Sequence, residues 1–287
     1  MALLNRVVSR RRKQRSVPGV TSRRAPGGKT GAMDRSQSLA VLELEAERVL
    51  SLVETAGADA LRPVPSCPGW TLEQVPNHLG RVYAMVATVL QGDPDRPPDR
   101  DRIPSRPDGQ PPTEWMRERF EILMPLLREI PEDSRRWNFA TGPASPVSFW
   151  WRRQMHETLI HRLDAELAVS QPITSTQPEI AADGIGDFLA VIGFRRVERD
   201  EIQPGDEMSI HLHATDAGPD AEWTIYPAHD AFAESHLKAD VALRGPAWAL
   251  DRWCWRRDPL HTQGPGRGLE LEFFGDQQAA EEWRPTI

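Results

Sequence analysis

The sequence predicts a two-domain α+β protein, in which an antiparallel four-helix bundle precedes a small C-terminal α+β domain. Apolar residues recur at helical spacing in four segments before Pro172, and a period of two residues is typical of the segments after it. The chain has 287 residues, which is enough for two domains of ordinary size. We therefore expect residues 34–172 to form the bundle and residues 173–287 to form the second domain.

The composition narrows the class of protein. Apolar residues make up 39% of the chain and charged residues 27%, and no stretch approaches the ~20 apolar residues of a membrane span. The chain has two cysteines, Cys67 and Cys254, far apart in the sequence. This usage argues against a disulfide framework and fits a reducing compartment. The sequence thus predicts a cytoplasmic protein with no membrane partner.

Residues 1–33 differ from the rest and are predicted to be a disordered basic extension. Residues 1–32 contain nine Lys or Arg and no Asp or Glu. Since the whole chain carries −7, the remainder carries −16, which does not favour a nucleic-acid partner. No apolar core follows the basic cluster, so it does not match a secretory signal. An alternative is that translation starts at Met33 and the extension is not made.

Four amphipathic helices are expected in the bundle, separated by proline-rich or polar loops at 93–112 and 131–146. In the second helix, Gln74 is the capping-box partner of Thr71. Pro76 is expected in the second turn, where it would remove a backbone donor. The first helix starts at the N-cap Ser36 and ends at Gly57, the second starts at the N-cap Thr71, the third runs over 113–130, and the fourth runs over 147–170.

The second domain begins with a helix predicted over 178–200. Runs with a period of two residues then predict half-buried strands, and two short helices complete the domain. The strands are expected at 208–214, 222–226, 238–243 and 269–273, and the helices at 246–257 and 276–283.

Polar residues in the fourth helix predict a metal site. At about 100° per residue, Glu157, His161 and Asp164 fall on one strip beside apolar positions, whereas His156 points about 100° away from Glu157. Buried charge is costly unless it is paired or bound to metal, and imidazole and carboxylate are both good zinc ligands. His78 in the second helix is the best third ligand, and three protein ligands leave one position open. The alternative is a surface pair of Glu157 and His161.

Two motifs carry a family resemblance. Ser66-Cys-Pro-Gly-Trp70 followed by His78-Leu-Gly80, and the segment from Trp151 to Glu166, resemble the mycothiol-dependent maleylpyruvate isomerase family, which belongs to the DinB-like metal-binding bundles of actinobacteria. The resemblance implies that His78, Glu157 and His161 are metal ligands. It also implies that Asp164 is functional, either in orienting a ligand or in handling a proton.

The C-terminal segments resemble the family's sterol-carrier-like second domain. They comprise residues 239–246, Trp253-Cys-Trp-Arg-Arg257 and Gly275-Asp276. The family's second-domain arginine falls on Arg256 or Arg257, and we expect Arg256 to bind a substrate carboxylate. The family commonly has a glycine before these arginines, where this chain has Trp255.

The resemblance implies an enzyme that uses Zn²⁺ or another divalent metal and mycothiol. Its partners would be a low-molecular-weight thiol and a small electrophilic substrate, and it would act as a monomer or homodimer. The reaction would be thiol-assisted cis–trans isomerisation or thiol transfer. A non-catalytic regulatory protein that binds metal or a small ligand, and a metal-dependent hydrolase, stay open as alternatives.

Both cysteines and the histidines outside the predicted metal site are expected to have no role in catalysis or metal binding. Cys67 and Cys254 are expected to be small apolar side chains rather than nucleophiles. His211 and His213 share one face of a strand, and we expect that face to be exposed rather than to bind metal. No signal attaches to the histidines at positions 229, 236 and 261.

Overall fold

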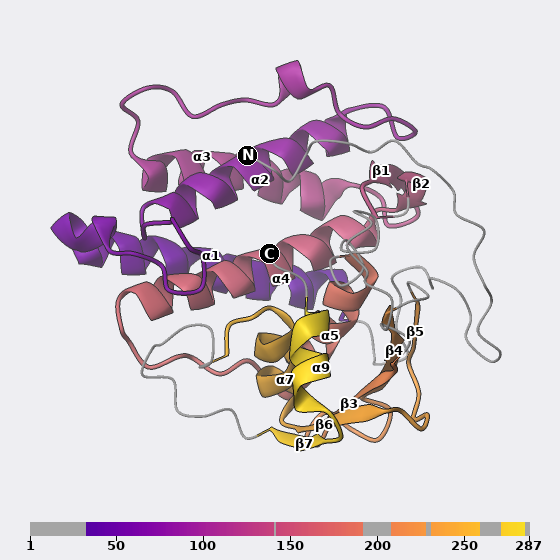
Figure 1. The fold of residues 1–287 in the computed structure, drawn as a ribbon. Helices are drawn as coiled ribbons and strands as arrows, with labels where there is room; N and C mark the ends of the chain where they lie inside the picture. The colour runs from indigo at the N-terminus through magenta and orange to yellow at the C-terminus, as the bar shows by residue number, and fades with distance from the viewer. Residues whose placement is uncertain (1–32, 141, 192–207, 228–230, 259–270, 285–287) are drawn as a thin grey trace.

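The computed structural model describes residues 33–140, 142–191, 208–227, 231–258 and 271–284. Of the predicted basic extension, all but Met33 lies outside these residues. The two-domain α+β fold is confirmed, with a helical N-terminal region and a C-terminal domain that contains a sheet (Figure 1). None of the helices in the described residues is both long and apolar enough to cross a bilayer.

Four long helices form the N-terminal region, and α1 packs on α4 while α2 packs on α3. Residues 131–146, predicted as a loop, contain an antiparallel hairpin with an irregular register. Its strands are too short and too polar to show an alternating pattern. The elements are α1 (Arg35–Ala56), η1 (Gly57–Leu61), α2 (Gln74–Gln91), η2 (Arg100–Arg102), α3 (Pro112–Glu129), β1 (Arg135–Asn138), β2 (Gly142–Pro146) and α4 (Ser148–Ala168).

The starts of two helices differ from the predictions. The N-cap of α1 is Asp34 and not Ser36, because the Asp34 side chain accepts a hydrogen bond of 2.8 Å from the Gln37 backbone N–H. Helix α2 begins at Gln74, whose side chain accepts from the Thr71 backbone N–H at 2.7 Å. Pro76 therefore lies in the first turn, where an N–H has no intrahelical partner. The predicted loss of a backbone hydrogen bond at Pro76 is wrong.

The close packing of α2 on α3 depends on Gly80, which lies in the same motif as His78. A Cβ atom at Gly80 would lie 2.2 Å from the Trp115 ring, so no larger residue fits without moving the ring. Trp115 itself is buried. Because Gly80 lies two residues after His78, the same contact fixes the position of α2 at the motif.

The C-terminal domain is a five-stranded sheet with strand order β5-β4-β3-β6-β7, in which β3 and β6 are parallel and the other neighbours antiparallel. Helix α7 packs on β3, β6 and α5, and α5 also contacts α4 of the bundle. Strand β5 was not predicted, and the predicted end of the α5 helix near residue 200 lies outside the described residues. The elements are α5 (Pro178–Val191), β3 (Ile210–Ala214), β4 (Glu222–Tyr226), β5 (Ala231–Ala233), β6 (Val241–Gly245), α7 (Ala247–Cys254), β7 (Glu272–Phe274) and α9 (Gln277–Trp283).

Candidate metal centre

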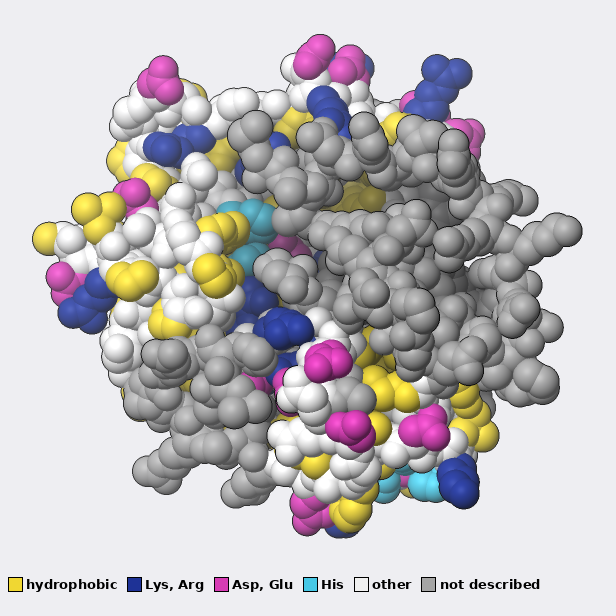
Figure 2. Space-filling view, in the orientation of Figure 1, with side chains coloured by type: hydrophobic (Ala, Val, Ile, Leu, Met, Phe, Trp, Pro, Cys, Tyr) yellow, Lys and Arg dark blue, Asp and Glu magenta, His cyan; other side chains and the backbone are white. Residues whose placement is uncertain are grey.

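Three side chains from two helices converge in the bundle. His78 Nε2 lies 3.0 Å from Glu157 Oε1, and His161 Nε2 lies 3.5 Å from the same oxygen. One donor atom from each residue lies within 4.8 Å of the other two. The side chains are 22%, 19% and 10% exposed for His78, Glu157 and His161, so a small molecule could reach the cluster from one side. Histidine side chains are visible in Figure 2 near the centre of the view, beside hydrophobic ones.

The donor set fits a zinc-like ion. Two imidazole nitrogens and one carboxylate oxygen form a common ligand set of open zinc sites. Ligand atoms about 2.0–2.1 Å from a tetrahedral ion lie roughly 3.3 Å from one another. The distances of 3.0 and 3.5 Å from Glu157 to the two histidines bracket that value. A divalent ion could therefore be accommodated with small side-chain movements.

Asp164 and Trp70 orient the histidines. Asp164 Oδ2 lies 2.9 Å from His161 Nδ1, and this contact favours the tautomer that leaves the Nε2 lone pair facing Glu157. The Trp70 ring stacks on the His161 ring, with centroids 5.7 Å apart and planes at 10°, and its centroid lies 5.1 Å from that of His78. The Cys-Pro-Gly-Trp turn thus restrains both rings.

Asp164 is fully buried and is held by groups from both domains. Arg257 Nε and Nη2 donate to its two oxygens at 2.9 Å each, and Ser66 Oγ donates to Oδ1. The Cys67 Sγ lies 3.4 Å from Asp164 Oδ2 and 3.3 Å from Arg257 Nη2. A residue of the C-terminal domain therefore helps to position a ligand of the bundle.

The end of α7 explains why Arg257 reaches Asp164. The Arg256 N–H donates to the Trp253 carbonyl at 3.1 Å, and the Arg257 N–H donates to the Arg252 carbonyl at 2.9 Å. With Arg256 at φ 56°, this is the Schellman pattern, which favours glycine at the left-handed position. That position immediately precedes Arg257, so the end of α7 turns the chain and sets the direction of the Arg257 side chain.

The structure does not bring the predicted Arg256 to the cluster. The Arg256 Nη2 donates to the backbone carbonyls of Arg284 at 2.5 Å and Glu281 at 3.4 Å. Its carboxylate-binding role stays a prediction. Arg153, which is not among the predicted site residues, donates to Glu157 from one turn away and also to Asp187. The i,i+4 spacing of Arg153 and Glu157 was the available signal.

The other polar residues near α4 have structural partners. His156 Nε2 lies 2.7 Å from Asp183 Oδ2, which confirms that His156 points away from the cluster. Arg152 Nε donates to the same carboxylate at 2.7 Å. These pairs lie between α4 and α5 and join the two domains.

Electrostatics around the cluster favour a charged carboxylate and a neutral His78. Burial opposes ionisation of Glu157, but Arg153 and the two histidines outweigh it and hold its pKa well below the usual value. Burial lowers the pKa of His78. Burial also opposes the charge on His161, but hydrogen bonds to Asp164 and Glu157 raise its pKa to about 9. A metal would therefore displace a proton from His161.

The two cysteines do not provide a thiolate. Burial, followed by the charge of Asp164, raises the pKa of Cys67 to about 12 despite the opposing effect of Arg257. Burial raises the pKa of Cys254 well above its usual value. Both thiols are therefore protonated at neutral pH, which agrees with the structural roles predicted for them.

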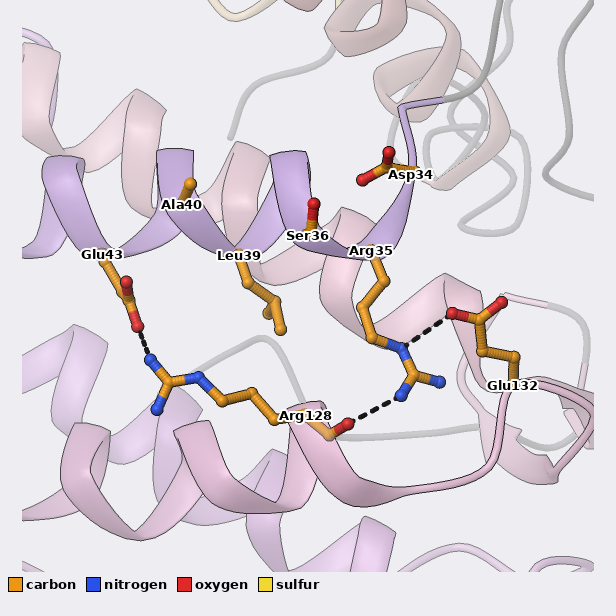
Figure 3. A pocket seen from close by; sticks show the side chains of 8 residues that line it. All are labelled: Asp34, Arg35, Ser36, Leu39, Ala40, Glu43, Arg128 and Glu132. Carbon is orange, nitrogen blue, oxygen red and sulfur yellow. Dashed lines mark hydrogen bonds and ion pairs between the residues drawn. The ribbon is translucent and has the colours of Figure 1, made fainter.

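A shallow hollow elsewhere on the surface does not offer an alternative site. Figure 3 shows its side chains between the start of α1 and the end of α3. Arg35 pairs with Glu132 at 3.3 Å and with the Arg128 carbonyl at 2.8 Å, while Arg128 pairs with Glu43. Four of its charged side chains are thus paired, Asp34 caps α1, and the lining contains no histidine or cysteine.

The fold and the cluster define a two-domain protein with a candidate divalent-metal centre in a helical bundle. Two family models match the chain: the mycothiol maleylpyruvate isomerase N-terminal domain over residues 42–166, and the C-terminal domain of the same family over residues 179–282. The chain belongs to the mycothiol-dependent maleylpyruvate isomerase family.

Solved structures agree with this assignment at the level of the fold. The crystal structure of the mycothiol-dependent maleylpyruvate isomerase is similar to this chain, with a TM-score of 0.51, 14% identity, and coverage of 77% of this chain and 88% of that one. A mutant of that isomerase with a histidine replaced by alanine gives the same values. No curated protein matches the sequence.

Proposed function

We propose that this chain is a divalent-metal, mycothiol-dependent enzyme of the maleylpyruvate isomerase type. The observation that carries the proposal is the convergence of His78, Glu157 and His161 from two helices, with donor distances that fit a zinc-like ion. Family membership and the related isomerase structures support the choice of thiol.

The metal, when bound, would lower the pKa of a coordinated thiol and so supply a nucleophilic thiolate. Among the described residues, Cys67 is the thiol next to the cluster, and burial raises its pKa to about 12. This favours an external thiol as the nucleophile. Addition of the thiolate to an activated double bond, rotation and elimination would give cis–trans isomerisation, and stopping after addition would give thiol transfer.

The residues of this chain would bind and orient the reacting groups. Asp164 holds the Nδ1 proton of His161, and Trp70 covers the two imidazole rings. Arg257 uses Nε and Nη2 on Asp164 and Nη1 on the Trp255 carbonyl, so we assign it to positioning Asp164 rather than to the substrate. Arg256 is the candidate to bind a substrate carboxylate, and cytoplasmic action as a monomer or homodimer is part of the same proposal.

The test combines metal analysis with a spectroscopic signal. Wild-type protein and the His78→Ala variant are loaded with Co²⁺, and metal content and absorption are measured before and after addition of mycothiol. We expect wild type to gain a sulfur-to-cobalt charge-transfer band and the variant to show none. A wild-type spectrum insensitive to mycothiol would favour a non-catalytic metal protein. Thiol-free hydrolysis of esters or amides would favour a hydrolase.

A further inference from the structure

We propose that the C-terminal domain carries a second divalent-metal site, formed by His211, Glu222 and His236. His236 Nδ1 lies 2.9 Å from Glu222 Oε2, and His211 Nε2 lies 3.5 Å from the same oxygen. The centroids of the two imidazole rings are 4.8 Å apart, at 86°. One donor atom of each residue lies within 4.8 Å of the other two, as in the bundle.

The sheet register and one short connection bring these residues together. In the β3–β4 pair, His213 is opposite Glu222 and His211 is opposite Thr224, so the histidines and the carboxylate share one face. Thr224 Oγ1 donates to the Ser235 carbonyl at 3.0 Å and accepts from the Leu237 N–H at 3.3 Å. These bonds hold the segment between β5 and β6 over the sheet, and they place His236 beside Glu222.

His211 and Glu222 are both buried at this site, and Glu222 contacts histidines rather than a permanently charged cation among the described residues. His211 is 6% exposed, against the predicted exposed strand face, and its Nε2 makes no hydrogen bond with any described residue. Glu222 is 8% exposed, and its ion-pair partners within the described ranges are histidines, with no Lys or Arg. A buried carboxylate and an unpaired imidazole nitrogen are both costly, and one cation between them would satisfy both.

The site is also accessible and chemically selective. The side chain of His236 is 73% exposed, so an ion can enter from solvent. His213 Nδ1 lies 2.6 Å from Glu222 Oε1, which orients the carboxylate and leaves Oε2 for the ion. Two imidazoles and one carboxylate suit Zn²⁺, Co²⁺, Ni²⁺ or Cu²⁺ rather than Mg²⁺ or Ca²⁺. Histidine side chains appear at the lower edge of Figure 2, separate from those near the centre.

A bound ion would join three segments of the C-terminal domain. It would connect β3, the first residue of β4 and the segment between β5 and β6. We therefore expect it to stabilise this domain rather than to take part in the reaction of the bundle. Both proposed sites would bind the same class of ion. An experiment must therefore measure the number of ions bound at each site separately.

The test is zinc stoichiometry in four full-length proteins: wild type, His78→Ala, His236→Ala and the double variant. After saturation with Zn²⁺ and removal of free ion, we expect two, one, one and no zinc ions per chain. His236 is exposed, so its replacement should not unfold the protein. We also expect Zn²⁺ to raise the Tm of His78→Ala and to leave the Tm of the double variant unchanged.

The outcomes separate the two sites. Unchanged stoichiometry on His236→Ala replacement would overturn the second site whatever the bundle binds. One zinc in both wild type and His78→Ala, with none in His236→Ala, would support the second site and count against the bundle site. Lys238→Ala is the matched control, since it changes an exposed residue of the same segment that is not a ligand. It should retain the wild-type stoichiometry.

Discussion

The two histidine clusters of this protein are assembled in different ways. The bundle cluster takes two donors from successive turns of α4 and one from α2, and buried groups of both domains hold it in place. The sheet cluster takes its donors from a strand, a strand start and a connecting segment, and its outermost histidine is largely exposed. The first site is enclosed by buried partners, whereas the second includes one solvent-exposed histidine, His236.

This difference predicts unequal responses to changes around the ligands. Support for the bundle cluster is buried and charged, so its loss should affect both stability and metal affinity. Support for the sheet cluster comes from an uncharged hydroxyl, Thr224, and from the partly exposed His213, so its loss should matter less. Four experiments test this contrast.

The largest effect is expected for Arg257→Ala. This change breaks a buried ion pair and leaves Asp164 without its guanidinium, which should cost about 3–5 kcal/mol of unfolding free energy. Metal affinity of the bundle should fall by about 10–100-fold, because Asp164 orients His161. Denaturant unfolding and metal titration measure the two effects. Arg244→Ala is the control: it breaks an exposed pair with Glu272 and should cost less than about 1 kcal/mol.

Gly80→Ala should have the next largest effect. The added methyl group overlaps the Trp115 ring, and overpacking of this kind costs about 1–3 kcal/mol. Because α2 carries His78, metal affinity should fall in the bundle but not in the sheet cluster. Gly186→Ala in α5 is the control, since the atom nearest to its added Cβ is Nη2 of Arg152, 3.3 Å away, against 2.2 Å to the Trp115 ring at Gly80. An equal loss of metal affinity at both clusters would contradict the expectation that only the bundle cluster depends on the packing of α2.

The clusters should also respond differently to pH. The pKa of His161 is raised to about 9, and a metal binds the neutral imidazole. Bundle affinity should therefore fall by up to about tenfold per pH unit as the pH drops from 9 to 6.5. Burial lowers the pKa of His211, so this histidine does not compete for protons in that range. Calorimetric titrations of His236→Ala and His78→Ala at several pH values give the slope of metal affinity against pH for each cluster. Equal slopes would contradict the expected difference in pH dependence.

Arg256→Gly should have the smallest effect. Glycine relieves the left-handed backbone conformation, while the side-chain hydrogen bonds to two carbonyls are lost, so unfolding free energy should change by less than about 1 kcal/mol. Metal affinity should be unchanged at both clusters. If Arg256 binds a substrate carboxylate, KM should rise without a change in metal content. An unaltered KM would remove Arg256 from the substrate site.

The sequence could predict the candidate ligands of the bundle cluster because their signal is local. Glu157, His161 and Asp164 share a helical strip, and the motif around His78 marks the second helix. The start of α2 was predicted at Thr71 but lies at Gln74. Thr71 and Gln74 do make a capping-type contact, but the helix does not begin at Thr71. The resulting error misplaced Pro76 by a turn.

Contacts between segments that are far apart in the chain could not be predicted from the sequence. The approach of His236 to His211 depends on strand register and on hydrogen bonds from Thr224, neither of which leaves a periodic pattern. The choice between Arg256 and Arg257 depended on one backbone conformation at the end of α7. The division of the chain at residue 172 stays a prediction.

The contact of Arg257 with Asp164 has a consequence for any attempt to divide the protein. A fragment that stops at the end of the bundle would retain every donor atom of the candidate centre. It would also expose a carboxylate whose neutralising partner had been cut away, together with the acidic and basic faces that α4 now shares with α5. We therefore expect the helical half alone to be less stable than the full chain and to hold its candidate metal ligands less firmly.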